Sequence, residues 1–497
     1  MTVQDNFYST PGRQFALVAA ALTLARIISL IFGAPNLGPD ETQYWFWSLT
    51  PDFGYYSKPP LIAWSIAATT ALFGQSEWAV RLSAPLYHLG AASILYFLAR
   101  RLANPRAGFW AGIVWLTLPG VFLSAALITT DAPLMFFQAG ALFFFFRLIS
   151  SDSRKMDAAA LGAMIGFGML AKYAMIYFVI AAAIALILIP AIRKGVSFKS
   201  AVTVIAIALI VLAPNIAWNA AHDFDTLSHT AANADWGGAI GHPANLIKFL
   251  GDQIAIAGPI LIVLIIISIT SAIRDKSDKA PGRRALVIFS LMPIAIVAAQ
   301  AVISRAHGNW AAAAYPSAVV LAAIWASSNS RSMMATRTSV ALHSMIGIGF
   351  LIVFTNFAIA DAIGAGTTFK RLRGWDQHGP EIQAIAKNYS TILVDDREIT
   401  GELVYYTRGG PPVVAWNSNG VIDNHYEAFR PFVPKRDEPA LFVTDVEGAP
   451  AVKDSFGEVR FIGTSTAKMS PTRQRTLYLY ALSNYSPERF KADATTR

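Results

Sequence analysis

The chain has 497 residues, of which 54% are hydrophobic and only 14% are charged, and its mean hydropathy is +0.45. Soluble domains carry about 25% charged residues, so this composition excludes an ordinary soluble protein and predicts a polytopic membrane protein. The absence of cysteine excludes disulfides and thiolate metal sites. The net charge of +9 does not indicate nucleic-acid binding, because the basic residues alternate with apolar runs as membrane topology requires.

Apolar stretches of nearly 20 residues predict eleven membrane-spanning α-helices, because the hydrocarbon core is roughly 30 Å thick. The first run, Phe15 to Phe32, is too long for the apolar region of a cleaved signal peptide, so we expect a retained span. Lys172, between the fifth and sixth stretches, indicates a turn at the membrane interface. The predicted spans are 14–33, 78–99, 107–127, 132–149, 157–171, 174–192, 201–218, 248–272, 285–304, 311–328 and 339–360.

Basic residues gather in alternate loops, and this bias orients the predicted helices. The basic loops contain Arg100, Arg101 and Arg106; Arg154 and Lys155; Arg193, Lys194 and Lys199; Arg274, Lys276, Lys279, Arg283 and Arg284; and Arg331 and Arg337. By the positive-inside rule these loops face the cytoplasm. The loops expected on the outer side are the first loop, the 219–247 loop, the 305–310 turn and the segment after 361.

The first outer loop, residues 34–77, is not simply polar. Residues 40–49 are rich in Tyr and Trp, and residues 59–73 are apolar but too short for a typical span. Aromatic side chains favour the membrane interface, so both segments are predicted to be helices that lie in the interface.

From about residue 370 the composition becomes that of a soluble α/β domain of about 125 residues. The predicted strands are 391–395, 412–416, 440–444, 459–463 and 476–482, with a helix at 398–407. The chain is therefore expected to divide into a transmembrane module, 1–360, and an α/β domain on the outer side of the membrane, 361–497.

Two adjacent acids, Asp40 and Glu41, follow the first predicted span. A carboxylate near a water-poor pocket can act as a general base, because desolvation raises its proton affinity. The alternative is a helix cap, since an acid before an aromatic helix stabilises the first turn. Both interpretations can hold together if one carboxylate caps the helix and the other reacts.

Two cations of the outer loops could contact a phosphate. Lys58 precedes Pro59 and Pro60, which hold it in an extended conformation. Arg305 belongs to the polar cluster 304–310, which also contains His307, and arginine can bind a phosphate through two hydrogen bonds. The alternative for both cations is an anchor at the membrane surface.

Asp131 and Lys172 also lie at outer ends of predicted helices. Asp131 lies two residues before Pro133 at the start of the fourth span, an arrangement typical of helix capping. It is also a third acid on the face that carries Asp40, and is therefore a candidate catalytic residue. Lys172 is either a phosphate contact or a surface anchor.

A divalent cation is a further candidate ligand. His222, Asp223, His229 and His242 share the outer 219–247 loop. Their spacing matches no established metal signature, so a solvated loop is the alternative.

These motifs resemble the bacterial branch of the protein O-mannosyltransferase and aminoarabinose transferase superfamily of GT-C glycosyltransferases. The resemblance covers most of the chain. It rests on Asp40-Glu41 with the aromatic residues that follow, Tyr55-Tyr56-Ser57-Lys58-Pro59-Pro60, Thr130-Asp131-Ala132-Pro133 and Leu170-Ala171-Lys172-Tyr173. Residues 401–406 and 410–414 are similar to the outer domain of one subgroup, which includes rhizobial lipopolysaccharide and lipid A galacturonosyltransferases.

The resemblance implies a role for each matching residue. It implies that Asp40, with Glu41 beside it, acts on the acceptor hydroxyl, that Asp131 is the second acid, and that Lys58, Lys172 and Arg305 bind the donor phosphate. His307, in the same cluster as Arg305, is a further candidate for that phosphate. One departure is that aminoarabinose transferases place a metal-binding Glu before the loop lysine, where this chain has Ser57. The departure argues against a metal and against aminoarabinose as the sugar.

The expected function is an inverting glycosyltransferase at the periplasmic face of the bacterial inner membrane. It would move galacturonic acid, or another hexose-type sugar, from a polyprenyl-phosphate donor to lipopolysaccharide core or lipid A. The chain has no convincing motif for binding a nucleotide sugar. A lipid-linked donor would explain why such a motif is not needed. Two alternatives remain open: a protein acceptor, as in O-mannosylation, and a transporter or flippase of lipid-linked sugars.

Overall fold

A computed structural model describes residues 10–33, 35–150, 154–232, 235, 241–434 and 438–486. The chain forms two compact units. The first consists of Met1–Ile31 and Lys58–Leu351, and the second of Phe32–Ser57 and Ile352–Arg497. The second unit therefore combines a segment of the first predicted loop with the C-terminal part of the chain.

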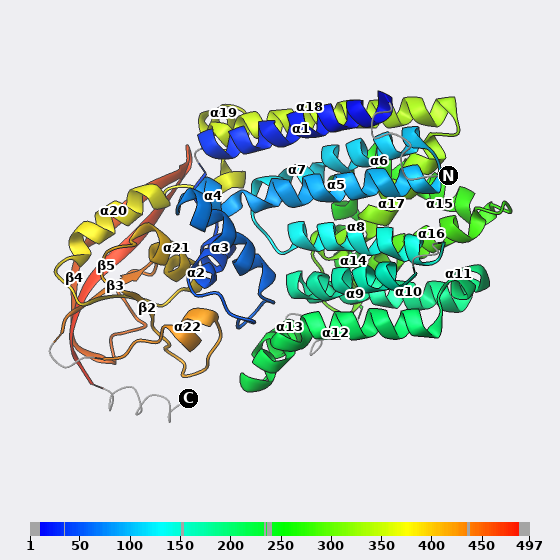
Figure 1. Cartoon of the computed structure of the whole chain (residues 1–497). Coiled ribbons are helices and arrows are strands. Elements are labelled where there is room, and N and C mark those ends of the chain that lie inside the picture. The colour runs from blue at the N-terminus through cyan, green and yellow to red at the C-terminus, as the bar shows by residue number, and fades with distance from the viewer. Residues whose placement is uncertain are drawn as a thin grey trace. The chain divides into compact units, whose positions relative to one another are not determined.

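The first unit is a bundle of apolar helices (Figure 1). In the described residues, seven helices are long and apolar enough to cross a membrane, or up to nine if each of two bent pairs is one span. The seven are α1 (Thr10–Phe32), α4 with α5 (Glu77–Arg81 and Ser83–Leu102), α8 (Asp131–Leu148), α12 (Phe198–Ala221), α16 (Ala280–Ile303), η2 with α17 (Gly308–Ala314 and Tyr315–Ala326) and α18 (Ser330–Thr355).

The other helices of this unit are shorter or bent. They are α3 (Leu61–Phe73), the pair α6 and α7 (Pro105–Thr117 and Pro119–Ala126), α9 (Arg154–Ala171), η1 (Tyr173–Met175), α10 (Ile176–Leu188), α11 (Pro190–Gly195), α13 (Asp225–Ala232), and the pair α14 and α15 (Pro243–Ala257 and Pro259–Arg274). The predicted spans 157–171 and 174–192 thus correspond to helices, and the predicted turn at Lys172 is confirmed.

The structure corrects the prediction of one continuous span over 248–272. The chain bends by 102° between α14 and α15, at Gly258, whose φ of +80° suits glycine. A Cβ atom at this position would collide with the ring of His343. Pro259 then begins α15, because its fixed φ suits a first helical position.

Two arginines of the first unit, Arg26 and Arg147, have partners within the bundle. The guanidinium of Arg26 is buried, donates to the carbonyl of Leu116 and lies 4.6 Å from the ring centre of Phe122. Arg147 pairs with buried Asp157 at 2.9 Å between Nε and Oδ1. Both arginines therefore have partners that stabilise their charges within the helical bundle.

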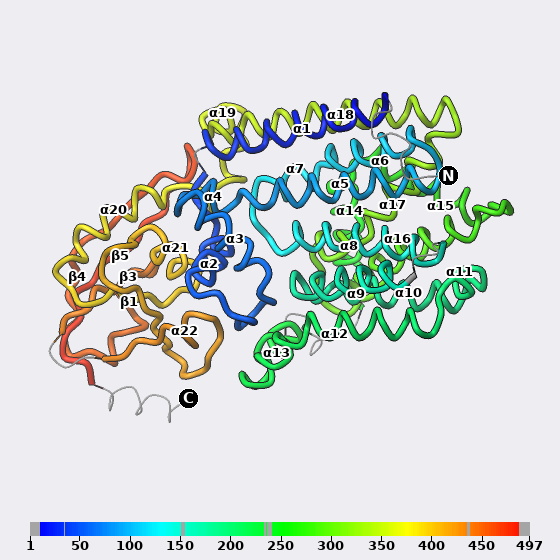
Figure 2. The backbone as a smooth tube through the Cα atoms, in the orientation of Figure 1, coloured from blue at the N-terminus to red at the C-terminus, as the bar shows by residue number. Residues whose placement is uncertain are grey.

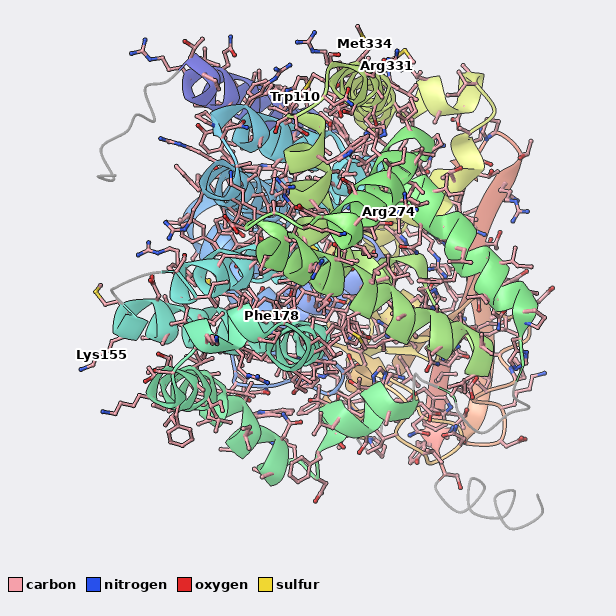
Figure 3. The ribbon with its side chains drawn as sticks, turned by 90° about the vertical axis from the view of Figure 1, so that its right-hand side faces the viewer. Trp110, Lys155, Phe178, Arg274, Arg331 and Met334 are labelled. Carbon is pink, nitrogen blue, oxygen red and sulfur yellow. The ribbon has the colours of Figure 1, made fainter. Side chains whose placement is uncertain are left out.

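The basic loops gather at one end of this bundle, as the charge pattern predicts. Figure 3 shows that end, with Lys155, Arg274 and Arg331 around it. Lys155 lies in the first turn of α9, Arg274 ends α15, and Arg331 lies at the start of α18. Because α9 rises about 1.5 Å per residue, Lys172, just beyond its other end, lies on the opposite side of the bundle.

The second unit is built on a five-stranded sheet with the order β2-β1-β3-β5-β4. The strands are β1 (Thr391–Val394), β2 (Val413–Ala415), β3 (Ala440–Thr444), β4 (Phe456–Ser470) and β5 (Arg473–Tyr485). Strands β2, β1 and β3 are parallel, whereas β5 is antiparallel to both β3 and β4. Figure 2 shows β1 and β3 side by side. All five predicted strands are present, although β4 and β5 extend into a longer hairpin.

Helices pack on this sheet and on each other. They are α2 (Pro39–Ser48), α19 (Phe357–Ala362), η3 (Gly366–Leu372), α20 (Trp375–Ala386), α21 (Arg397–Tyr406) and α22 (His425–Phe429). Helix α2, from the first predicted loop, packs against α21, and the rings of Trp45 and Tyr405 meet edge to face at 4.7 Å. Gly401 permits this approach, because a Cβ atom there would lie 2.9 Å from Oγ1 of Thr42.

Candidate active site

The predicted site residues are distributed over both units. Asp40 and Glu41 belong to the second unit, whereas Lys58, Asp131, Lys172, Arg305 and His307 belong to the first.

In the first unit, the structure brings Asp131 and Lys172 together. Asp131 begins α8, and Lys172 lies between α9 and η1. Nζ of Lys172 is 2.7 Å from Oδ1 of Asp131, and the two side chains are only 21% and 12% exposed. The amide of Asn309, in η2, donates to the other oxygen, Oδ2, at 2.8 Å. Both carboxylate oxygens therefore have a donor, as a largely buried charge requires.

This geometry departs from the capping interpretation of Asp131. Thr130 is the N-cap of α8, and Asp131 is the first helical residue. Its carboxylate points to Lys172 and Asn309 rather than closing the first turn of its own helix. A lysine ammonium has three donors, so a ligand such as a phosphate oxygen could bind Lys172 beside Asp131.

Further polar contacts hold the elements around this pair. The hydroxyl of Tyr173 donates to Oδ1 of Asn215 at 2.9 Å and accepts from Nδ2 of Asn219 at 3.3 Å. Buried Gln253 donates to the carbonyl of Gly308 at 3.1 Å. These bonds tie η1 to α12 and η2 to α14, and thereby fix the segments that carry Lys172 and Asn309.

The other predicted phosphate contacts of the first unit are more open. Arg305 and His307 are exposed, and the ring of His307 meets that of Trp310 at 5.2 Å. The guanidinium of Arg305 has no ion-pair or hydrogen-bond partner among the described residues. Lys58 is half-buried and leads through Pro59 and Pro60 into α3.

In the second unit, the two adjacent acids have different environments. Glu41 is buried, and its Oε2 accepts from the backbone N–H of Gly38, the N-cap of α2, at 2.9 Å. Asp40 is 64% exposed at its side chain, and its Oδ1 lies 2.6 Å from Nη2 of Arg397. Glu41 therefore caps α2, whereas Asp40 is the acid of the pair that is exposed to solvent.

Arg397 orients Asp40, and sequence analysis missed it. Its Nε donates to Oε1 of Gln43 at 2.9 Å, while Nη2 donates to Asp40. Burial alone would lower the pKa of Arg397, but the charge of Asp40 and the hydrogen bond to it, together with smaller contributions from Tyr426 and Tyr44, raise that pKa. Arg397 is 357 positions from Asp40 in the sequence, and no local motif marks it.

The structure does not assemble the predicted metal candidates into a site. Among the residues that the structure describes, no three His, Asp or Glu side chains form a group that could hold a metal ion. His222 is the C-cap of α12 and its ring stacks on that of Trp218 at 4.0 Å, while Asp223 has a left-handed backbone with φ of 49°. His229 lies in α13.

Known proteins resemble this chain in sequence. A family model described as dolichyl-phosphate-mannose-protein mannosyltransferase matches residues 57–218. The lipid A galacturonosyltransferase RgtD of Rhizobium johnstonii is 33% identical over 440 residues, which cover 87% of this chain and 91% of that protein. An undecaprenyl phosphate-α-4-amino-4-deoxy-L-arabinose arabinosyl transferase of Pseudomonas fluorescens is 29% identical over 150 residues, 27% of each chain.

A solved structure shares the fold. ArnT from Cupriavidus metallidurans, in the apo state, matches with a TM-score of 0.66 at 16% identity, over 94% of this chain and 98% of that one. The helical unit and the small sheet unit therefore define a multi-pass GT-C fold. The chain belongs to the GT-C glycosyltransferase superfamily of protein O-mannosyltransferases and aminoarabinose transferases, in the family of the rhizobial galacturonosyltransferase RgtD. It is a glycosyltransferase.

Proposed function

We propose that this enzyme transfers galacturonic acid from a polyprenyl-phosphate donor to lipid A or lipopolysaccharide core, at the periplasmic face of the bacterial inner membrane. The observation that carries the proposal is the 33% identity to lipid A galacturonosyltransferase RgtD over 91% of that protein's length. The lipid donor is supported by ArnT of Cupriavidus metallidurans, whose fold this chain shares and which has been crystallised with undecaprenyl phosphate.

Asp40 is the proposed general base. Arg397 occupies its Oδ1, and Oδ2 has no hydrogen-bond partner among the described residues. This second oxygen is free to accept the proton of an acceptor hydroxyl. Arg397 and Gln43 fix the carboxylate in one orientation, as a base needs if it is to meet the hydroxyl in a reactive geometry.

The proposed reaction is a single displacement at the anomeric carbon. The acceptor hydroxyl gives its proton to Asp40, and its oxygen forms the new glycosidic bond as the bond from the anomeric carbon to the phosphate oxygen breaks. The bonding pair leaves with polyprenyl phosphate, and the configuration inverts. Lys58, Lys172, Arg305 and His307 are proposed to bind this phosphate, and such charge stabilisation commonly contributes several kcal/mol.

The remaining two acids receive supporting roles in this proposal. Glu41 holds the first turn of α2 and thus the position of Asp40. Asp131, with Asn309, holds the ammonium of Lys172 in place. Neither carboxylate is required to exchange a proton with the substrate.

Protein is the second candidate acceptor, because the matching family model is described as a protein mannosyltransferase. The deciding experiment incubates the purified chain with labelled polyprenyl-phosphate galacturonic acid, lipid A and envelope proteins. We expect the label in lipid A, with one polyprenyl phosphate released per sugar. Label in protein alone, or in free sugar alone, would contradict the proposal.

Two matched variants assign the base. Asp40→Asn should lower transfer by about 10²–10⁴-fold, the usual contribution of proton transfer. Asp52→Asn removes another exposed carboxylate of the same segment and should retain the wild-type rate. Near-wild-type transfer by Asp40→Asn would remove Asp40 from the mechanism while leaving the assigned substrates intact.

A further inference from the structure

A groove lies at the basic end of the first unit, where α15 ends and packs against α16. Its volume is about 750 Å³, within the roughly 300–1,000 Å³ typical of sites that hold small ligands. The lining residues are Ile266, Ile267, Thr270, Ser271, Arg274, Asp275, Lys276 and Arg283. None of them belongs to the candidate active site, since Arg274 lies at the same end as Lys155 (Figure 3), the end opposite Lys172.

The lining changes from apolar to cationic along α15. Ile266 and Ile267 are exposed, 57% and 42%, as expected of side chains that face hydrocarbon. Thr270 and Ser271 follow one turn later, and Arg274 another turn later. The distance from Ile266 to Arg274 is about 12 Å along the helix axis, so the groove extends from an apolar zone into a polar one.

The cations of the groove are in excess over the acids. Oδ2 of Asp275 lies 2.7 Å from Nη1 of Arg283, and its Oδ1 accepts from the N–H of Ser277 at 2.8 Å. Both carboxylate oxygens of Asp275 therefore already have a partner. Arg274 and Lys276 have no ion-pair or hydrogen-bond partner in the part of the chain that the structure describes, and both are exposed. Two uncompensated cations thus lie beside an apolar surface.

We propose that this groove binds an anionic phospholipid of the surrounding bilayer. The phosphate group would bind Arg274 and Lys276, the hydroxyl of Ser271 would donate to a headgroup oxygen, and an acyl chain would cover Ile266 and Ile267. Basic pockets between helices at the membrane surface bind anionic headgroups in this way. The proposal is independent of the sugar-transfer reaction, because no residue of the groove takes part in it.

The test measures lipid binding to the full-length protein in detergent by native mass spectrometry, with phosphatidylglycerol and phosphatidylcholine as probes. Wild type should bind the first phosphatidylglycerol in preference to phosphatidylcholine. The double variant R274Q/K276Q should bind it about 30-fold more weakly, as expected for the loss of two basic groups near the headgroup. Lys276→Glu, a single change on the exposed loop, should weaken binding as well.

The matched control is the double variant K155Q/R331Q, which removes two exposed cations from the same end of the bundle (Figure 3). It should bind phosphatidylglycerol as wild type does. An equal loss in this control, or equal binding of the two lipids by wild type, would overturn the proposal. Displacement of the lipid by equimolar polyprenyl phosphate, or by inorganic phosphate, would also overturn it, because the occupant would then be a different anion.

Discussion

Asp395 of the second unit is a buried carboxylate with an incomplete set of hydrogen bonds. It follows β1 directly, and its Oδ2 accepts from Oγ1 of Thr444 at 3.3 Å. Oδ1 is buried and has no partner among the described residues. Burial, with smaller contributions from the charges of Asp396 and Asp445, raises the pKa of Asp395 to about 6.

This raised pKa makes the second unit less stable as pH rises from about 4 to about 6. The unfolded chain releases the proton near the ordinary value of 3.8, whereas the folded chain retains it up to about 6. Folding therefore favours the protonated form, and the free energy of unfolding falls through this window. A difference of roughly two pH units corresponds to about 3 kcal/mol above pH 6.

The substitution Asp395→Asn removes the charge and keeps the shape. At pH 7.5 it should stabilise the strands around position 395 by up to about 3 kcal/mol, which is about 100-fold in amide exchange protection. At pH 4 the variant and wild type should be alike. Hydrogen exchange with mass spectrometry of peptides covering β1 and β3 measures this in the full chain. Asp423→Asn, which changes an exposed acid of the same unit, is the control.

An equal change in protection at pH 4 and pH 7.5 for Asp395→Asn would contradict this role of the carboxyl group. Such a result would mean that packing or hydrogen bonding, and not the ionisation of the carboxyl group, determines the effect.

Two further sets of substitutions test the bundle. Gly258→Ala should lower the thermal midpoint of the purified protein, because a positive φ costs a residue with a side chain about 1–3 kcal/mol and the new Cβ atom would collide with the ring of His343. The control Gly251→Ala, at a position with open space around it, should leave the midpoint unchanged. Equal effects of the two substitutions would argue against the bend at Gly258 as the cause. Asp131→Asn and Lys172→Met should each slow sugar transfer, and the double variant should be no slower than the worse single one, since the two side chains act as a pair. Additive losses would show that they act separately.

The sequence predicts most of the secondary structure because apolar length and strand patterning are local properties. Nine of the eleven predicted spans follow from them, if each bent pair is one span, whereas the helices at 157–171 and 174–192 are not among the candidate spans of the described residues. The five strands of the second unit follow too, and so does the turn at Lys172, where a charge interrupts apolar sequence. The bend at Gly258 is missed, although the pair Gly258-Pro259 is a local turn signal, because the apolar residues on both sides continue without a gap.

The site could be predicted only in part. Asp131 and Lys172 are notable in the sequence, but their pairing, and the part played by Asn309, depend on how α8, η1 and η2 pack. Arg397 is one cation among many in a soluble domain, and only the packing of α21 on α2 gives it a role. Contacts between segments distant in the sequence leave no local pattern.

We propose that Asp40 and Lys58 face the periplasm and that the lipid-linked donor is used there. The chain contains no cysteine, so single cysteines at positions 40, 58 and 155 can be labelled in intact cells with a membrane-impermeant maleimide. Cysteines at positions 40 and 58 should react before the inner membrane is permeabilised, whereas a cysteine at position 155 should react only afterwards. Reaction at position 40 or 58 only after permeabilisation would contradict this proposal.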